Sequence, residues 1–271
     1  MPIQKDGLSM TQTTYTHRHH ESVLRSHRWR TVENSAAYLL PHLRRGLTLL
    51  DVGCGPGTIT ADFAARLAPG RVCGMDPSAD VLVAAQRDHP GVEFATGDVY
   101  TMAFDEGSWD IVHTHQVLQH LPDPVTALKE MRRVVRPGGI VAARDSDYAA
   151  FTWHPADERL TRWLALYHEI ARSNGGEPDA GRHLLSWAQL AGFTRVDASA
   201  SAWCFATPDE RAWWGGLWAD RMTSSAIAKQ AIRDGRATAD DLAAMADAWR
   251  SWAAAEDGWF AVLHGEIICT R

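Results

Sequence analysis

Apolar runs alternate with amphipathic stretches along this chain, and the clearest pair spans residues 49–67. Leu49, Leu50 and Val52 surround an aspartate, a glycine-rich loop follows, and residues 61–67 carry apolar side chains at helical spacing. A short apolar run that ends at glycine indicates a buried strand, whereas apolar positions three and four apart indicate a helix. The pattern therefore predicts a strand, a tight loop and a helix.

The same alternation continues to the end of the chain and predicts a parallel sheet with helices on both faces. Further strands are expected at residues 71–76, 92–97, 108–115, 140–144, 193–205 and 259–270. Helices are expected from residue 77, at 125–135, from about 155 to 172, at 181–191 and across most of 208–256. An amphipathic run over residues 21–45 precedes the first strand.

The helical stretch between the last two strands is longer than a simple connection. We therefore expect three parts in the chain. Residues 1–45 form an N-terminal helical lid segment, residues 46–206 and 257–271 form the sheet domain, and residues 207–256 form a helical insertion that caps a substrate.

The composition and net charge indicate where the protein is located and which partners it binds. The chain has 271 residues, 45% apolar and 22% charged, which is an ordinary globular balance. A net charge of −6 gives no general electrostatic basis for binding nucleic acid or an anionic membrane. The N-terminus lacks the apolar core of a signal peptide, and no apolar run is long enough to span a bilayer. We expect a cytoplasmic protein without nucleic-acid or membrane partners.

The cysteines and histidines predict no metal site. The four cysteines are scattered and lack the paired spacing of a zinc framework, so free thiols in a reducing compartment are expected. The His17–His20 region carries three histidines but no matching carboxylate or cysteine set, and it is interpreted as a solvated or lid-like segment.

The glycine-rich loop carries the first sign of chemistry. Glycines adopt positive φ and let a ligand approach the backbone, while the start of a helix offers free N–H groups. A dinucleotide-binding loop places its third glycine three residues after the second. Here Gly53 and Gly55 fit, but Thr58 stands at that position and the glycine comes early, at Gly57. The spacing predicts a nucleotide-binding turn and disfavours NAD.

Acidic residues follow the next two predicted strands. Asp76 lies at the end of the second strand, about 20 residues past the loop, where a carboxylate accepts hydrogen bonds from ribose hydroxyls. Asp98 follows the third strand in the same way. Either aspartate alone fits a turn, whereas the ordered set of loop glycines and strand-end acids indicates one ligand site.

Two later segments complete a family pattern. Residues 108–115 form an apolar strand that leads into Gln116–Pro124, and an Arg-Pro-Gly-Gly turn at 136–139 precedes another strand. Over about residues 45–146 the set resembles the class I S-adenosylmethionine-dependent methyltransferases, most of all the small-molecule branch of ubiquinone- and menaquinone-type enzymes. The resemblance implies a Rossmann-like, mostly parallel sheet of seven strands with the last antiparallel. It also implies a helical N-terminal segment, a helical insertion after strand six, and S-adenosylmethionine as the cofactor.

The resemblance also implies roles for individual residues. Asp51 lies near the amino group of the cofactor, Asp98 takes the adenine amino group, and Pro77 flanks the adenine. An arginine in the position of Arg30 meets the cofactor carboxylate, for which a guanidinium provides a planar, charge-assisted fork. The expected cofactor-binding residues are Arg30, Asp51, Gly53, Gly55, Gly57, Asp76, Pro77, Asp98, Val99, His115 and Gln116.

Histidines after strand four are the candidate catalytic residues. His115 and His120 follow that strand, and histidine is a natural base because its ordinary pKa lies near working pH. Each has a second interpretation, since His120 also suits a packing or capping role and His115 also suits a cofactor contact without base chemistry.

Tryptophan is concentrated in the second half, where 10 of the 12 tryptophans follow Tyr148. One interpretation is that most of them fill a core. The other is that some line an apolar cavity for a flat organic substrate, in which case the lining residues are Tyr148, Trp213, Trp214 and Trp218.

Methyl transfer from S-adenosylmethionine to a small, apolar or aromatic metabolite is the function that these features predict. The acceptor atom (oxygen, nitrogen or carbon) is left open. A non-methylating rearrangement and a cofactor-binding regulatory protein without turnover are the alternatives. Nucleic-acid methylation is disfavoured, because the chain lacks a basic tail and the Asn/Asp-Pro-Pro-aromatic type of motif. The oligomeric state is open, with a homodimer as one option.

Overall fold

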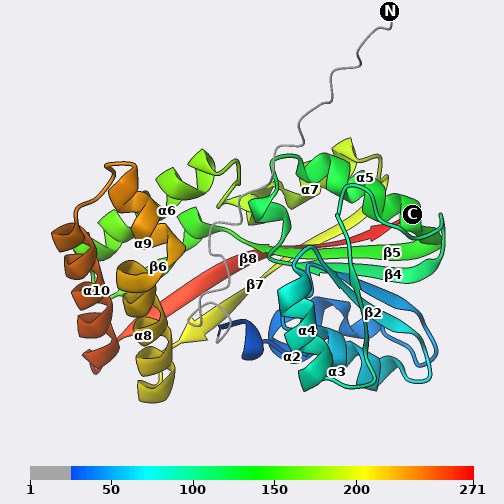
Figure 1. The fold of residues 1–271 in the computed structure, drawn as a ribbon, viewed down its shortest axis with the longest axis horizontal. Coiled ribbons are helices and arrows are strands. Elements are labelled where there is room, and N and C mark those ends of the chain that lie inside the picture. Colours follow the sequence, from blue (N-terminus) through cyan, green and yellow to red (C-terminus); the bar gives the residue numbers. More distant parts are fainter. Residues whose placement is uncertain (1–25) are drawn as a thin grey trace, which may run out of the picture.

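The computed structural model describes residues 26–271 and shows one eight-stranded sheet that runs through two lobes (Figure 1). The part of the predicted N-terminal lid segment within residues 1–25, including the His17–His20 region, lies outside the described residues. Among residues 26–271, no helix has the length and apolar character needed to cross a membrane.

The first five strands of the sheet are parallel, and the order of the main path is β3-β2-β1-β4-β5-β8-β6. Their bounds are β1 Leu49–Val52, β2 Val72–Asp76, β3 Glu93–Thr96, β4 Trp109–His115 and β5 Val135–Ser146. The strand order reverses between β1 and β4, which are direct neighbours. A crevice forms at such a reversal, at the carboxyl ends of the strands.

A long last strand links the two lobes. β8 (Trp259–Thr270) runs antiparallel to β5 along one edge and to β7 (Arg195–Phe205) along the other. The predicted antiparallel last strand is confirmed. An eighth strand that the sequence analysis did not predict, β6 (Thr152–His154), pairs with the start of β8. Its three residues are too few to show an alternating pattern.

Helices cover both faces of the parallel half of the sheet. On one face, α2 (Val32–Ser35), the 3-10 turn η1 (Ala37–His42) and α3 (Thr58–Leu67) pack against apolar side chains such as Leu49. On the other face, α5 (Pro124–Val134) and α7 (Leu184–Leu190) pack against side chains such as Leu50. Successive residues of β1 thus face opposite cores, as the pleat of a strand requires.

The remaining helices and 3-10 turns include two short turns, η2 and η3, that the sequence did not predict. The bounds are α4 Ala79–Asp88, η2 Leu118–His120, η3 Tyr148–Ala150, α6 Glu158–Ser173, η4 Ala180–His183, α8 Pro208–Ser224, α9 Ala226–Arg233 and α10 Ala239–Ala254. The helix expected at 181–191 is thus a 3-10 turn followed by a short α-helix. The region expected to be helical from 208 onward contains three helices.

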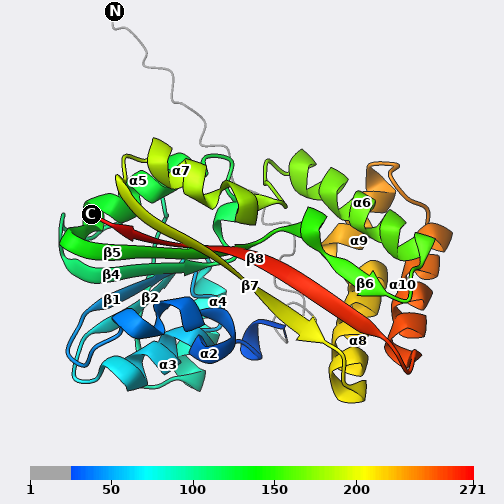
Figure 2. The ribbon, with the colours of Figure 1, turned by 180° about the vertical axis from the view of Figure 1, so that it is seen from behind.

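The helices α6, α8, α9 and α10 form the second lobe around the far ends of β7 and β8 (Figure 2). Trp163, Trp218 and Trp249 are almost fully buried there, with ring centroids 4.6 to 5.9 Å apart. The helix α6 precedes β7 in the chain, so this helical lobe is built from two separate segments. Aromatic burial of this kind supplies the lobe with a core of its own.

Candidate functional site

The glycine-rich loop after β1 is fixed by contacts that leave no room for a side chain. Gly53 has φ +73°, and a Cβ there would lie 2.3 Å from Cγ2 of Val117. Gly57 has φ +79° at the start of α3, and a Cβ there would lie 2.6 Å from the Phe94 ring. The loop is therefore held between the segment after β4 and the strand β3.

A large cavity of about 1250 Å³ opens over the carboxyl ends of β1 to β4. All the predicted cofactor-binding residues except Gly57 line it, and so does His120. Gly57 does not line the cavity. It packs against Phe94 of β3, so we infer that it shapes the loop. The lining residues among those predicted are Arg30, Asp51, Gly53, Gly55, Asp76, Pro77, Asp98, Val99, His115 and Gln116.

Backbone amides orient the two strand-end carboxylates. The Gly55 amide donates to Oδ2 of Asp76 at 3.1 Å, and the Ser78 amide donates to Oδ1 at 2.9 Å. Asp98 Oδ1 accepts a hydrogen bond from the Tyr100 amide at 2.9 Å. The Asp98 carboxylate is thus held by the turn that follows its own strand, whereas Asp76 is held both by its own turn and by the loop after β1. Each oxygen retains further acceptor capacity.

Asp51 is buried, and both of its oxygens have partners within the protein. Its Oδ1 lies 2.8 Å from Nδ1 of His113, and its Oδ2 accepts a 2.6 Å hydrogen bond from the Thr60 hydroxyl. These bonds connect β1 to β4 and to the first turn of α3. The sequence did not predict this bracing, and the contact with the cofactor amino group that the resemblance implies stays a prediction.

A chain of polar side chains crosses the floor of the site. Arg30 donates to Oε1 of Gln116 at 2.5 Å, and the Gln116 amide donates to the Ser146 hydroxyl at 2.7 Å and lies 2.9 Å from Nε2 of His264. Gln116 has φ +55°, the left-handed conformation that costs a non-glycine residue about 1 kcal/mol. This turn directs the Gln116 side chain between the N-terminal segment and β8.

His115 is buried at the cavity wall, and neither of its ring nitrogens has a hydrogen-bond partner among residues 26–271. Burial, with Arg30 and Arg144 nearby, holds the pKa of His115 well below its usual value. The ring is therefore neutral at physiological pH, with one donor and one acceptor available. Two unmatched polar atoms at a cavity wall are available to a ligand or to water.

His120 lies on η2, next to the same cavity. Burial lowers the pKa of His120 to about 3, with Arg30 as the secondary cause. Its Nε2 atom lies 3.1 Å from Nε2 of Gln119. This imidazole is also neutral at physiological pH, with one ring nitrogen protonated and the other able to accept a hydrogen bond.

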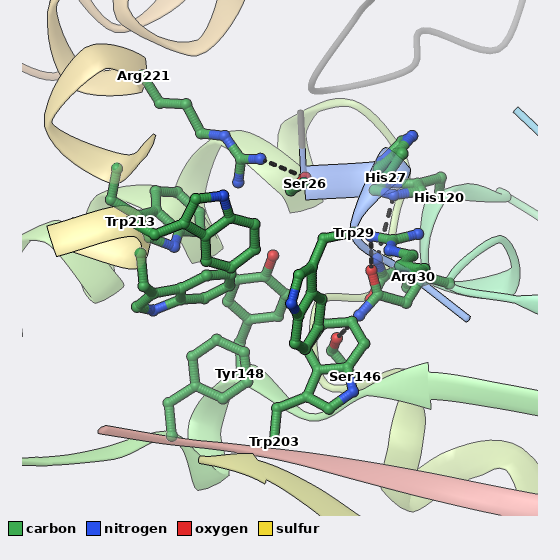
Figure 3. A pocket seen from close by; sticks show the side chains of 15 residues that line it. Ser26, His27, Trp29, Arg30, His120, Ser146, Tyr148, Trp203, Trp213 and Arg221 are labelled. Carbon is green, nitrogen blue, oxygen red and sulfur yellow. Dashed lines mark hydrogen bonds between the residues drawn. The ribbon is translucent and has the colours of Figure 1, made fainter. Parts of the chain in front are cut away.

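A second space, here called the aromatic pocket, lies beside the large cavity (Figure 3). Seven aromatic rings line it, from the N-terminal segment, η3, β7 and α8. The rings are those of Trp29, Tyr148, Phe151, Trp203, Trp213, Trp214 and Trp218. All four residues predicted to form a substrate pocket are among them. The free space between the rings is only about 30 Å³.

The two spaces meet at a defined place. His27, Arg30, Gln116 and His120 line both the large cavity and the aromatic pocket. Figure 3 shows His27, Arg30 and His120 grouped on one side of the pocket, opposite Arg221 and Trp213. This boundary between the two spaces is where a ligand in one cavity comes nearest to a ligand in the other.

Several lining residues were not predicted. Trp29 lies 5.2 Å from both Trp203 and Trp213 by ring centroid, and Trp203 comes from β7. Only the tertiary fold joins these three elements. Arg221 carried a readable signal, since its spacing from Trp214 and Trp218 places all three on one face of α8.

Comparisons with known proteins give a consistent result. Residues 50–143 match a family model described as a methyltransferase domain. An uncharacterised methyltransferase of Schizosaccharomyces pombe is 34% identical over 260 residues, covering 91% of this chain and 92% of its own length. A probable methyltransferase of Aspergillus luteorubrus is 30% identical and covers 89% and 92%. A trans-aconitate 2-methyltransferase of Methylobacterium radiotolerans is 36% identical over about half of each chain.

Solved structures agree on the fold. A phosphoethanolamine N-methyltransferase of Haemonchus contortus, solved with S-adenosylhomocysteine, aligns with a TM-score of 0.54 at 18% identity, over 87% of this chain and 52% of that chain. A methyltransferase-like protein of Bacillus halodurans aligns with a TM-score of 0.53 at 20% identity, over 86% and 96%.

Proposed function

The chain belongs to the class I small-molecule methyltransferases that use S-adenosylmethionine, and on this premise we propose that it methylates a small, apolar or aromatic metabolite bound in the aromatic pocket. The observation that carries the proposal is the meeting of the two spaces at four residues. A cavity that suits the cofactor thus adjoins a pocket that suits a flat acceptor.

The residues at the large cavity fit S-adenosylmethionine. In this proposal Asp76 would accept hydrogen bonds from both ribose hydroxyls, and Asp98 would accept one from the adenine amino group. Pro77 and Val99 would lie beside the adenine, and Arg30 would meet the carboxylate. The unmatched nitrogens of His115 offer further partners. When bound there, the cofactor supplies a sulfonium methyl group, the reactive part of the chemistry.

The protein's own task is alignment and exclusion of water. The aromatic rings would hold the acceptor's flat body, and the polar chain from Arg30 through Gln116 would fix the boundary between the two ligands. His115 and His120 are neutral. An unmatched ring nitrogen of His115 would accept a hydrogen bond from an acceptor O–H or N–H, whereas Nε2 of His120 already accepts from the Gln119 amide, which leaves its other nitrogen as a donor. Because a lowered pKa makes a weak base, we propose that they orient the acceptor more than they remove its proton.

The experiment that tests the function has two steps. Isothermal titration with S-adenosylmethionine and, separately, NAD should show binding of S-adenosylmethionine alone. A screen of small metabolites read by mass spectrometry should then find a product that has gained one methylene unit. A product of unchanged mass would point to a rearrangement, and cofactor binding without any turnover would point to a regulatory protein; either result contradicts the proposal.

Several expectations from the sequence stay predictions. They are the division of the chain at residues 45, 206 and 256, the cytoplasmic location, the lack of a nucleic-acid partner and the homodimer.

A further inference from the structure

The charge of the aromatic pocket is one-sided. Two arginines, Arg30 and Arg221, contribute to its wall, and no aspartate or glutamate does so among the described residues. His120 adds little charge to this wall, since burial lowers its pKa to about 3. A ligand in this pocket therefore meets aromatic rings and guanidinium groups.

Arg221 is held rigidly at the α8 side of the pocket. It is 4% exposed, its guanidinium carbon lies 4.8 Å from the centroid of the Trp218 ring, and it donates a 2.8 Å hydrogen bond to the Ser26 hydroxyl. Figure 3 shows it extending from α8 toward Ser26, across the pocket from His120. A planar guanidinium fixed in this way is suited to two parallel hydrogen bonds with a carboxylate.

The rings that would attract a cation already face cations. Trp203 has the guanidinium carbons of Arg30 and Arg144 at 5.7 and 5.0 Å from its centroid, and Trp218 has that of Arg221. Aromatic faces bind ammonium groups through the same interaction. An ammonium ligand would therefore meet like charges at these two rings, which disfavours an amine that is protonated at physiological pH.

We propose that the acceptor carries a carboxylate on a flat apolar body, and that Arg221 binds this carboxylate while the reacting atom lies toward His120. The inference rests on the proposed function, because it names the substrate class of the same pocket. The present space of about 30 Å³ holds about two water molecules, so the body enters by moving rings apart. Trp29 is 36% exposed and contacts Trp213, which makes this pair the rim of the pocket.

The test uses three probes of matched shape: phenylacetate, phenylacetamide and phenethylamine. Each is titrated into the full-length protein saturated with S-adenosylhomocysteine, and binding is followed by calorimetry and by tryptophan fluorescence. Phenylacetate should bind about tenfold or more tightly than the amide, the gain expected from hydrogen bonds to a charged group, and the amine should bind most weakly. Equal affinities, a preference for the amine, or no binding of phenylacetate at millimolar concentration would overturn the proposal.

Substitutions of Arg221 distinguish binding of the carboxylate from a purely structural role of this side chain. Arg221→Met should remove the advantage of phenylacetate while the amide keeps its affinity within about twofold, and Arg221→Lys should restore part of that advantage. Arg233→Gln, an exposed position on α9, is the matched control and should bind like the wild type. If the Met variant does not fold, the Lys variant still decides, since it keeps the charge but loses the fork. Equal losses for acid and amide in either variant would show a structural role and refute the inference.

The two proposals fail in different ways. If S-adenosylhomocysteine does not bind the wild-type protein, the proposed function is wrong at its cofactor. If S-adenosylhomocysteine binds and the probes show no preference for the acid, only the carboxylate inference is wrong.

Discussion

Removal of the Asp76 carboxylate is the sharpest test of the cofactor site. Asp76→Ala takes away the acceptor proposed for two ribose hydroxyls, and it also releases the amides of Gly55 and Ser78. A hydrogen bond to a charged group contributes about 1.5–3 kcal/mol, so two of them correspond to a loss of roughly 3–6 kcal/mol in binding. Because each 1.4 kcal/mol is tenfold, affinity for S-adenosylmethionine should fall at least a hundredfold.

The measurement is isothermal titration of wild-type and variant protein with S-adenosylmethionine, alongside urea unfolding to confirm that the variant is folded. Asp80→Ala is the matched control, since this exposed aspartate in the first turn of α4 changes the net charge equally but does not line the cavity. It should bind like the wild type. An Asp76→Ala affinity within about twofold of the control would refute the ribose assignment.

Three further predictions concern stability. Gly53→Ala places a Cβ 2.3 Å from a Val117 methyl, so urea unfolding should show a loss of about 1–3 kcal/mol, and an unchanged midpoint would contradict the described packing. Burial raises the pKa of Asp145 to about 7, so between pH 4 and 7 the folded state binds a proton that the unfolded state has lost, and the free energy of unfolding should fall by up to about 1.4 kcal/mol per pH unit as pH rises. Asp145→Asn should flatten that slope in urea unfolding at several pH values, and an identical slope would refute the assignment. Glu266→Gln leaves Arg144 buried without its ion pair and should cost about 3–5 kcal/mol by the same assay, whereas a change below about 1 kcal/mol would show that the pair adds little.

The sequence predicted the parallel half of the fold because its signals are local. Most strands of that half contain a short apolar run, and the residues that line the cavity lie at or just after the end of a strand, as Asp76 and Asp98 do. Carboxyl ends of parallel strands share one edge, so local order along the chain translates into neighbours in space. For this reason the sequence alone predicted both the family of S-adenosylmethionine-dependent enzymes and the class of the sheet.

The rest of the site depends on contacts between distant segments. Trp29 and Trp203 are 174 positions apart in the chain, yet their ring centroids lie 5.2 Å apart. Trp203 lies on β7, which pairs with β8, so its position depends on how the sheet is assembled. No spacing rule connects them. The pairing of Asp51 with His113 was missed for another reason, since a lone aspartate before a glycine loop suits both a ligand contact and a structural bond.

The strand β8 has a mechanical consequence for the whole molecule. Residues 264–270 pair with β5 beside the large cavity, residues 259–261 pair with β6 in the helical lobe, and β7 accompanies the strand along its length. A continuous two-stranded ribbon resists bending more than a loop does, so the lobes lack a flexible joint along this connection. Neither of the two rim tryptophans, Trp29 and Trp213, lies in the sheet, so we expect an acceptor to enter by displacement of these side chains and not by a hinge between the lobes.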